Sequence, residues 1–202
     1  MPRATAAAYS RKALYVMLIA SIFALIASFV LSLEKIHLLQ NPDATLSCSF
    51  NLVLNCATVM QTWQSAVFFN IPNMYIGLIS FPVLITVAVA GLGGAVFRRG
   101  FLIAMNIGVL LGTIFAYWLF FQSVYAIQVL CPWCLVVTFT CTLILASVEY
   151  IVLSQNVYGF SKSVHRRVKA LLDKGYLQLL VAVWVVFLIS LVFIKFGEAI
   201  FA

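Results

Sequence analysis

Five long apolar blocks dominate this chain and limit the folds that are open to it. Each block is about as long as the roughly 20 residues that an α-helix needs to cross the hydrocarbon core of a bilayer. The chain is 65% hydrophobic and 8% charged, whereas a soluble domain carries roughly 25% charged residues. No alternating pattern typical of a transmembrane β-barrel is visible. The sequence therefore predicts an all-α membrane protein with five transmembrane helices, at 13–33, 74–94, 101–121, 124–148 and 177–196.

Charged side chains are nearly absent from these predicted spans. A charge at the centre of a span costs about 2.5–3.5 kcal/mol on insertion scales. Lys195 is the exception, and it lies close to a helix end, where its ammonium can reach the headgroups. The first span is longer than a signal-peptide core and precedes no convincing cleavage site, so we expect it to be retained.

Basic residues gather in three segments: the N-terminus, the turn between the second and third spans, and the loop between the fourth and fifth. The positive-inside rule places these segments in the cytoplasm, and places loop 34–73 and the C-terminus outside. We interpret the basic 150–176 loop as an anchor on anionic membrane lipid rather than as a nucleic-acid site. The residues behind this prediction are Arg3, Arg11, Lys12, Arg98, Arg99, Lys162, Arg166, Arg167, Lys169 and Lys174.

Four of the five cysteines are expected on the outer side of the membrane, where disulfides persist. Cys48 and Cys56 lie in the predicted outer loop, and Cys131 and Cys134 form a C-x-x-C pair about two turns into the predicted fourth span. Cys141 lies deeper in that span, and we interpret it as a small buried apolar residue.

Three hypotheses account for the four cysteines. A structural disulfide can join Cys48 to Cys56, with Cys131 and Cys134 as packing residues. Four thiolates can also hold zinc, although a tetrathiolate at the lipid edge of an oxidising compartment would be unusual, and we expect no metal. In the third hypothesis a mobile loop disulfide exchanges with the helix pair, which passes two electrons to a lipid-soluble quinone.

The order of these motifs resembles the vitamin K epoxide reductase family, and its bacterial homologues in particular. The resemblance rests on the four cysteines, on "NLVLNC" at 51–56, on the N-x-x-x-G of 73–77 and on "CPWC" at 131–134. It covers roughly residues 13–150. It implies a four-helix catalytic core at 1–150 that includes the outer loop 34–73, followed by 151–202, which hold the basic loop and a peripheral fifth helix.

The resemblance also implies a role for each cysteine. Cys134 matches the sulfur beside the quinone, and Cys131 matches the one that exchanges with the loop. Cys56 is expected to form the interim bond with Cys131, and Cys48 to meet the partner protein.

Three further residues are expected beside the quinone, together with Cys134. Asn73 matches an asparagine whose amide hydrogen-bonds a quinone carbonyl, although Asn is also a good N-cap for the second span. Thr62 falls where many members have a Ser or Thr. Thr138 replaces a tyrosine that contacts vitamin K in animal members, and this change favours plain quinone reduction. Gly77, Gly108 and Gly112 permit either close helix packing or room for a flat ring.

The activity implied by the resemblance is quinone-dependent oxidation of protein thiols in a bacterial inner membrane, with menaquinone or ubiquinone as acceptor. Because the chain ends at Ala202, shortly after the fifth span, we expect the thioredoxin-like (DsbA-like) partner to be a separate protein. A DsbB-like oxidase is an alternative, but there the C-x-x-C comes first and the mobile pair later. A membrane scaffold with a purely structural loop disulfide is the non-enzymatic alternative.

Overall fold

The computed structural model describes residues 9–41 and 46–201, with side chains up to Gly197. Arg3 of the topology prediction therefore lies outside the described residues. The helices, in chain order, are α1 (Arg11–Gln40), α2 (Cys56–Met60), η1 (Trp63–Ala66), α3 (Asn73–Leu92), α4 (Arg99–Phe121), η2 (Gln122–Ile127), α5 (Pro132–Ser154), α6 (Lys162–Asp173) and α7 (Tyr176–Phe201).

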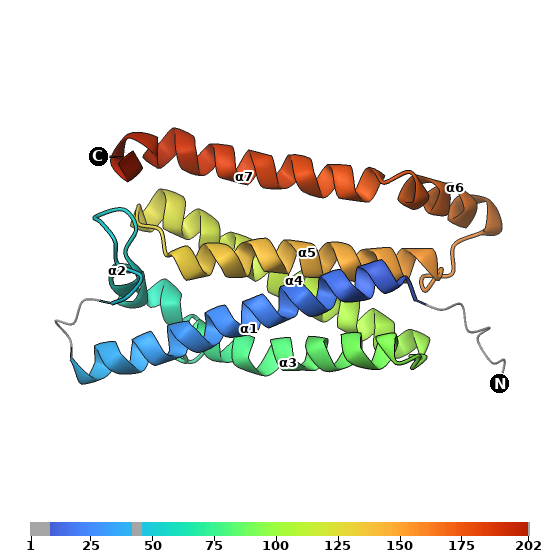
Figure 1. Cartoon of the computed structure of the whole chain (residues 1–202), viewed down its shortest axis with the longest axis horizontal. Helices are drawn as coiled ribbons and strands as arrows, with labels where there is room; N and C mark the ends of the chain where they lie inside the picture. The colour runs from blue at the N-terminus through green and yellow to red at the C-terminus, as the bar shows by residue number, and fades with distance from the viewer. Residues whose placement is uncertain (1–8, 42–45, 202) are drawn as a thin grey trace.

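Within the described residues, five helices are long and apolar enough to cross a membrane. They are α1, α3, α4 with its η2 extension, α5 and α7, and successive members run in opposite directions (Figure 1). The predicted all-α membrane fold is therefore confirmed. The short helices α2 and η1 lie at the same end of the bundle as the C-terminus, and α6 lies at the other end (Figure 1).

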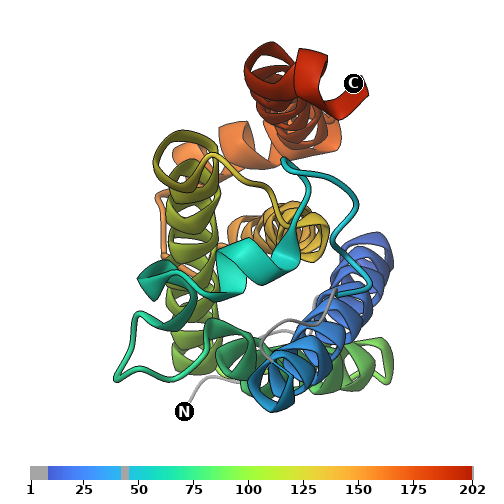
Figure 2. The same cartoon turned by 90° about the vertical axis from the view of Figure 1, so that its left-hand side faces the viewer.

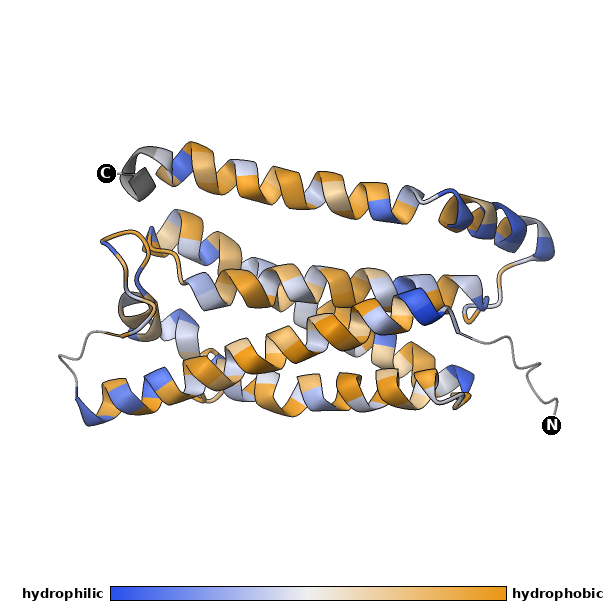
Figure 3. Ribbon diagram, viewed as in Figure 1, coloured by the Kyte–Doolittle hydropathy of each residue, from blue (hydrophilic) through white to orange (hydrophobic). Residues whose placement is uncertain are grey.

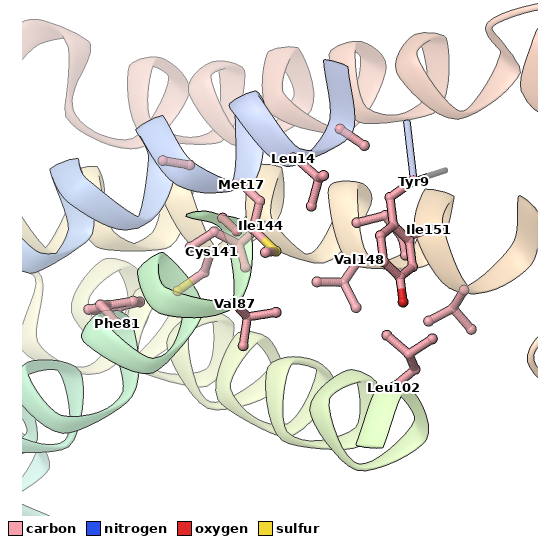
Figure 4. Close-up of a cluster of buried hydrophobic side chains, with 14 of the residues drawn as sticks. Tyr9, Leu14, Met17, Phe81, Val87, Leu102, Cys141, Ile144, Val148 and Ile151 are labelled. Carbon is pink, nitrogen blue, oxygen red and sulfur yellow. The ribbon is translucent and has the colours of Figure 1, made fainter. Parts of the chain in front are cut away.

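The four-helix core is built around α1 and α5. Helix α1 packs against α3 and α5, and α5 packs against α4, whereas α3 and α4 do not pack closely on each other. Buried apolar side chains from these four helices converge in one cluster, in which Met17, Phe81, Cys141 and Ile144 lie close together (Figure 4). This cluster holds the helices together and places Cys141 among apolar residues, as predicted.

Close approach of α1 and α3 depends on small side chains. A Cβ at Gly77 would overlap the side chain of Ser28 in α1, so this glycine serves close helix packing. The buried face of α1 also carries Ala20, Ala24 and Ala27, which let a neighbouring backbone come near. Of the two roles considered for Gly77, close packing is the one supported by these contacts.

The predicted start of the fourth span was wrong. Residues 124–127 belong to η2, a π-helical continuation of α4, and α5 begins only at Pro132. Gln128 adopts a left-handed conformation with φ 57°, which ends the preceding helix. Pro132 at the first helical position has no N–H to leave unpaired and a φ already suited to a helix. Cys131 is therefore the N-cap of α5 rather than a residue two turns inside it.

The other end of α5 also differs from the prediction. The helix continues to Ser154 and so includes Glu149, although the predicted spans contained no acidic residue. The carboxylate of Glu149 accepts a hydrogen bond of 3.0 Å from Nδ2 of the buried Asn106 in α4. A polar partner of this kind makes an acidic side chain tolerable within a membrane helix.

The last membrane helix, α7, lies on the periphery of the bundle, as predicted. It runs alongside α4 and α5 rather than between core helices (Figures 1 and 2). Most of its surface is exposed and apolar, whereas α6 carries many hydrophilic residues (Figure 3). Such a long apolar exposed helix is stable only where lipid or protein covers it.

Candidate functional site

The loop between α1 and α3 is closed by a disulfide between Cys48 and Cys56. Cys56 is the first residue of α2, and the side chain of Asn55 caps this helix by accepting a 3.1 Å hydrogen bond from Thr58 N. Asn51 shapes the turn before it, because its Oδ1 accepts hydrogen bonds from two backbone N–H groups. Both asparagines belong to "NLVLNC", but we had not predicted their structural roles, although asparagine in a turn or before a helix is a recognisable signal.

A short backbone bridge joins this loop to the segment before the C-x-x-C pair. Leu130 N donates to Val53 O at 2.7 Å, and Asn55 N donates to Leu130 O at 2.9 Å. Leu54 and Leu130 thereby form a parallel β-bridge. Cys56 lies two residues after Leu54, and Cys131 directly follows Leu130. The bridge between the two leucines therefore brings the two cysteines together.

Cys56 Sγ lies 3.4 Å from Cys131 Sγ. Cys131 is a free thiol at the N-terminus of α5, and its sulfur accepts a 3.4 Å hydrogen bond from Cys134 N. A hydrogen bond from the Cys134 side chain, assisted by the backbone N–H groups of Cys134 and Trp133, lowers the pKa of Cys131 despite its burial. A thiol with a lowered pKa beside a disulfide sulfur is placed for thiol–disulfide exchange.

The loop disulfide is covered by protein. Cys48 is 2% exposed and Cys56 0% exposed. Ser47 hydrogen-bonds Glu34 of α1 through both its backbone N–H and its hydroxyl, and Lys35 Nζ donates to Met60 O at 2.8 Å. These contacts fix the loop against the end of α1.

A cavity of about 510 Å³ opens on the other side of Cys131. It runs between α3 and α4, the two helices that do not pack closely, and most of the side chains lining it are apolar. Cys134 and Thr138 line it from α5, and Gly108 and Gly112 line it from α4. A Cβ at either glycine would meet open space, so these two glycines widen the cavity rather than bringing helices together.

Asn73 lines the same cavity and holds the loop beside it. Its Nδ2 donates to Gln64 O at 2.7 Å, and its Oδ1 accepts from Val67 N at 3.2 Å. Among the described residues, one of the two Nδ2 hydrogens has an acceptor, which leaves the second for a ligand. The alternative in which Asn73 caps the second span is wrong, because the N-cap of α3 is Pro72 and Asn73 bonds the 64–67 segment instead.

The two threonines expected at the site differ in position. Thr138 lines the cavity, and its hydroxyl donates to Cys134 O at 3.0 Å. Thr62 precedes η1 and hydrogen-bonds Val59 O at 2.8 Å, but it does not line the cavity. Ser65, which we had not predicted, lines it instead, with its hydroxyl bonded to backbone carbonyls.

Comparison with known proteins gives one match. The model of the vitamin K epoxide reductase family matches residues 15–149, which contain all four cysteines of the site. Searches of the curated proteins and of the solved structures found no match. The matched region covers more than half of the 202 residues. It includes the contact between Cys56 and Cys131 and the residues that line the cavity. The chain therefore belongs to the vitamin K epoxide reductase family of membrane thiol oxidoreductases.

Proposed function

We propose that this protein oxidises the thiols of a separate thioredoxin-like protein and passes the electrons to a quinone. The path runs from the loop pair, Cys48 and Cys56, to the helix pair, Cys131 and Cys134. The observation that carries the proposal is the 3.4 Å separation between Cys56 Sγ and Cys131 Sγ. Two cysteine pairs in contact can exchange disulfides with each other. A loop disulfide with a purely structural role would not require a free thiol beside it.

Each exchange step conserves sulfur bonds and electrons. A partner thiolate attacks Cys48 and releases Cys56 as a thiolate, and the second partner thiol then releases Cys48 and closes the partner's disulfide. Cys56 attacks Cys131 of an oxidised helix pair and releases Cys134, and Cys48 then displaces Cys131 to restore the loop disulfide. The partner loses two electrons, and the helix pair gains them as two thiols.

The cavity residues fit a quinone. The apolar lining and the open space at Gly108 and Gly112 suit a flat ring, and the second N–H of Asn73 is available to a carbonyl oxygen. A bound quinone, either menaquinone or ubiquinone, supplies the acceptor for the two electrons and two protons released when the Cys131 and Cys134 thiols close into a disulfide. The hydrogen bond from Cys134 N to Cys131 Sγ keeps that sulfur oriented.

Reaction with the partner requires the loop to move. Both sulfurs of the loop disulfide are buried, so a partner thiolate reaches Cys48 only after the 46–50 segment separates from α1. The hydrogen bonds between Ser47 and Glu34 are the contacts that would open. We place this loop on the outer face of a bacterial inner membrane, with the N-terminus in the cytoplasm, because of the distribution of basic residues.

The test uses the purified protein, a quinone and a reduced thioredoxin-like protein. We expect quinol to form, as followed by absorbance, and Cys134→Ala to abolish it while the protein remains folded in the membrane. Ser147→Ala changes a residue of the same helix that does not line the cavity, and it should retain the activity. A structural scaffold would form no quinol with any variant, and wild-type activity in Cys134→Ala would refute the assigned path.

A further inference from the structure

The fifth membrane helix lies outside the region matched by the family and is mostly exposed. Its contacts with the core are nevertheless confined to one face. Trp184, Leu188, Val192 and Phe196 recur every four residues along α7 and point to the core. Leu188 and Phe196 are 8% and 6% exposed, whereas the neighbouring Ile194 is 82% exposed.

The C-terminal half of this face packs against the end of α4, against η2 and against Leu130, which directly precedes Cys131. Leu188 and Phe196 form one buried cluster with Phe120, Val124 and Leu130. Leu130 is fully buried there, and its backbone makes the bridge to the cysteine loop. Val53 and Leu54, on the loop side of that bridge, pack against the same cluster. Helix α7 therefore packs against both segments that form the Leu54–Leu130 bridge.

A second contact links α7 to α4 and, through α4, to α5, the helix that carries Cys134. Trp184 Nε1 donates to the hydroxyl of Tyr117 in α4 at 2.9 Å, and this hydroxyl lies 2.7 Å from Thr142 Oγ1 in α5. The rings of Trp184 and Tyr117 meet edge to face with centroids 5.8 Å apart. A polar node of this kind fixes the relative position of three membrane helices.

The segment before Cys131 needs to be covered by protein because its backbone is irregular. The segment from η2 to Leu130 is irregular, with a π-helical turn and a left-handed Gln128. Irregular backbone near membrane depth is tolerated where protein rather than lipid covers it. Without α7, the buried Leu130 and its bridge would face lipid on one side, and the position of Cys131 would loosen.

We propose that α7 is a positioning element for the relay: Leu188 and Phe196 hold the Leu54–Leu130 bridge in place and so keep Cys56 within reach of Cys131. The inference rests on the proposed function, because it concerns the exchange step of that relay. The equilibrium between the loop disulfide and the Cys56–Cys131 bond depends on the effective concentration of Cys131 at Cys56, which is high only while the fold holds the two sulfurs together.

The test measures exchange directly, in a Cys134→Ser background, in which Cys131 can no longer pair with Cys134 and competes only with Cys48 for the sulfur of Cys56. The full-length protein is equilibrated in a fixed thiol buffer, and the fraction carrying this bond is determined by non-reducing peptide mapping. We expect Leu188→Ala and Phe196→Ala to lower the ratio of bonded to unbonded protein by about tenfold. Ile194→Ala, on the exposed face of the same helix, should leave it unchanged, and Leu188→Met should restore it.

Two further measurements separate positioning from folding. Trp184→Phe keeps the packing but removes the hydrogen bond to Tyr117, so it should lower the trapped ratio even where Leu188→Ala fails to fold. Apparent quinone affinity, measured in the variants with an intact Cys134, should not change. The inference would be overturned if the ratio of bonded to unbonded protein were the same in Trp184→Phe, Phe196→Ala and Ile194→Ala. Absence of the bond in the Cys134→Ser parent, with α7 intact, would instead refute the relay itself.

Discussion

Cys56 Sγ lies 3.4 Å from Cys131 Sγ, although 75 residues separate the two cysteines in the chain. The fold itself thus brings the loop disulfide into contact with the thiol of Cys131. This contact supports the proposed assignment, in which Cys56 of the loop exchanges with Cys131 of the helix. Cys48 is then left to the partner and Cys134 to the cavity.

Cys134→Ser should accumulate a Cys56–Cys131 disulfide, whereas Cys131→Ser should accumulate no bond between loop and helix. Without Cys134 the helix disulfide cannot re-form and release Cys56, so Cys131 competes only with Cys48 for Cys56. Without Cys131 the helix loses the sulfur that contacts the loop disulfide. Non-reducing peptide mapping distinguishes the two. A Cys48–Cys131 bond in the first variant would reverse the assigned roles of the loop cysteines.

The rate at which this bond forms should depend on pH through Cys131. The pKa of Cys131 is lowered, chiefly by the hydrogen bond from the Cys134 side chain. The rate should therefore rise with pH and level off below the pH at which an ordinary thiol ionises. Cys134→Ala removes this donor and should shift the profile to higher pH, whereas the hydroxyl of Cys134→Ser can retain the bond. Identical profiles would contradict the cause given for the shift.

The same lowered pKa links folding to pH. Because the folded-state pKa of Cys131 lies below its unfolded value, the thiolate contributes stability above the unfolded pKa. That contribution is lost as pH falls through the folded pKa. Melting of the protein with a reduced helix pair should accordingly respond more to pH across this window than melting of Cys131→Ser, which has no thiol to ionise at this position.

Asn73→Ala should weaken quinone binding and loosen the adjacent loop together. The variant loses hydrogen bonds to Gln64 O and Val67 N, each worth about 0.5–1.5 kcal/mol. It also loses the N–H that we assign to a quinone carbonyl. The apparent KM for quinone should rise several-fold, and the melting temperature should fall. Lowered melting with unchanged KM would limit Asn73 to holding the loop.

Gly112→Leu and Gly108→Leu should raise the KM for quinone by filling the cavity. Both glycines line it and have open space where a side chain would project. Gly100→Leu is the matched control, because Gly100 lies in the same helix and also faces open space but does not line the cavity. Equal KM values in all three would show that the ring binds elsewhere. The Cys56–Cys131 bond should still form in each.

Helix α6 has the features of an interfacial lipid-binding helix. It lies at the end of the bundle opposite the loop disulfide (Figure 1). Val164 and Leu171 are exposed on one side of it, although Leu172 beside them is buried. A helix with an apolar face and a basic face lies in the membrane surface and attracts anionic lipid.

Neutralising its basic face should therefore weaken selection of anionic lipid. We expect the triple variant Lys162→Gln, Arg166→Gln, Lys169→Gln to lose selectivity for spin-labelled phosphatidylglycerol over phosphatidylcholine, as measured by electron paramagnetic resonance. Each basic residue near the surface contributes about 1 kcal/mol. Lys195→Gln, near the other end of α7, is the control. Unchanged selectivity in the triple variant would rule out this role for α6.

Several features of this protein were predictable from the sequence because they depend on local chain properties. The length of an apolar run decides whether it spans a bilayer, and so the number of spans was predicted correctly. The four cysteines, "NLVLNC", the N-x-x-x-G of 73–77 and the order of these motifs together indicated the family that the match to residues 15–149 shows. The peripheral position of the fifth helix was also predicted.

Other features were decided by tertiary contacts. An apolar run does not reveal where one helix stops and the next begins, so the start of α5 at Pro132 was missed, and with it the place of Cys131 as N-cap. Asn73 was equally suited to a cap or to a ligand, and packing of the 64–67 segment against α3 gave its side chain other partners. Gly77 and Gly112 both line the cavity, but a Cβ at Gly77 would overlap Ser28 of α1, whereas a Cβ at Gly112 would meet open space.

The contact between Cys56 and Cys131 depends on a bridge that has no local sequence signal. Leu54 and Leu130 are ordinary apolar residues, and each becomes a bridging residue only because the loop folds back over the end of α5. The number of spans follows from the free energy of placing each apolar run in lipid, which is a property of that run alone. The distance between two sulfurs follows from how several runs and loops pack together, and that is a property of the whole chain.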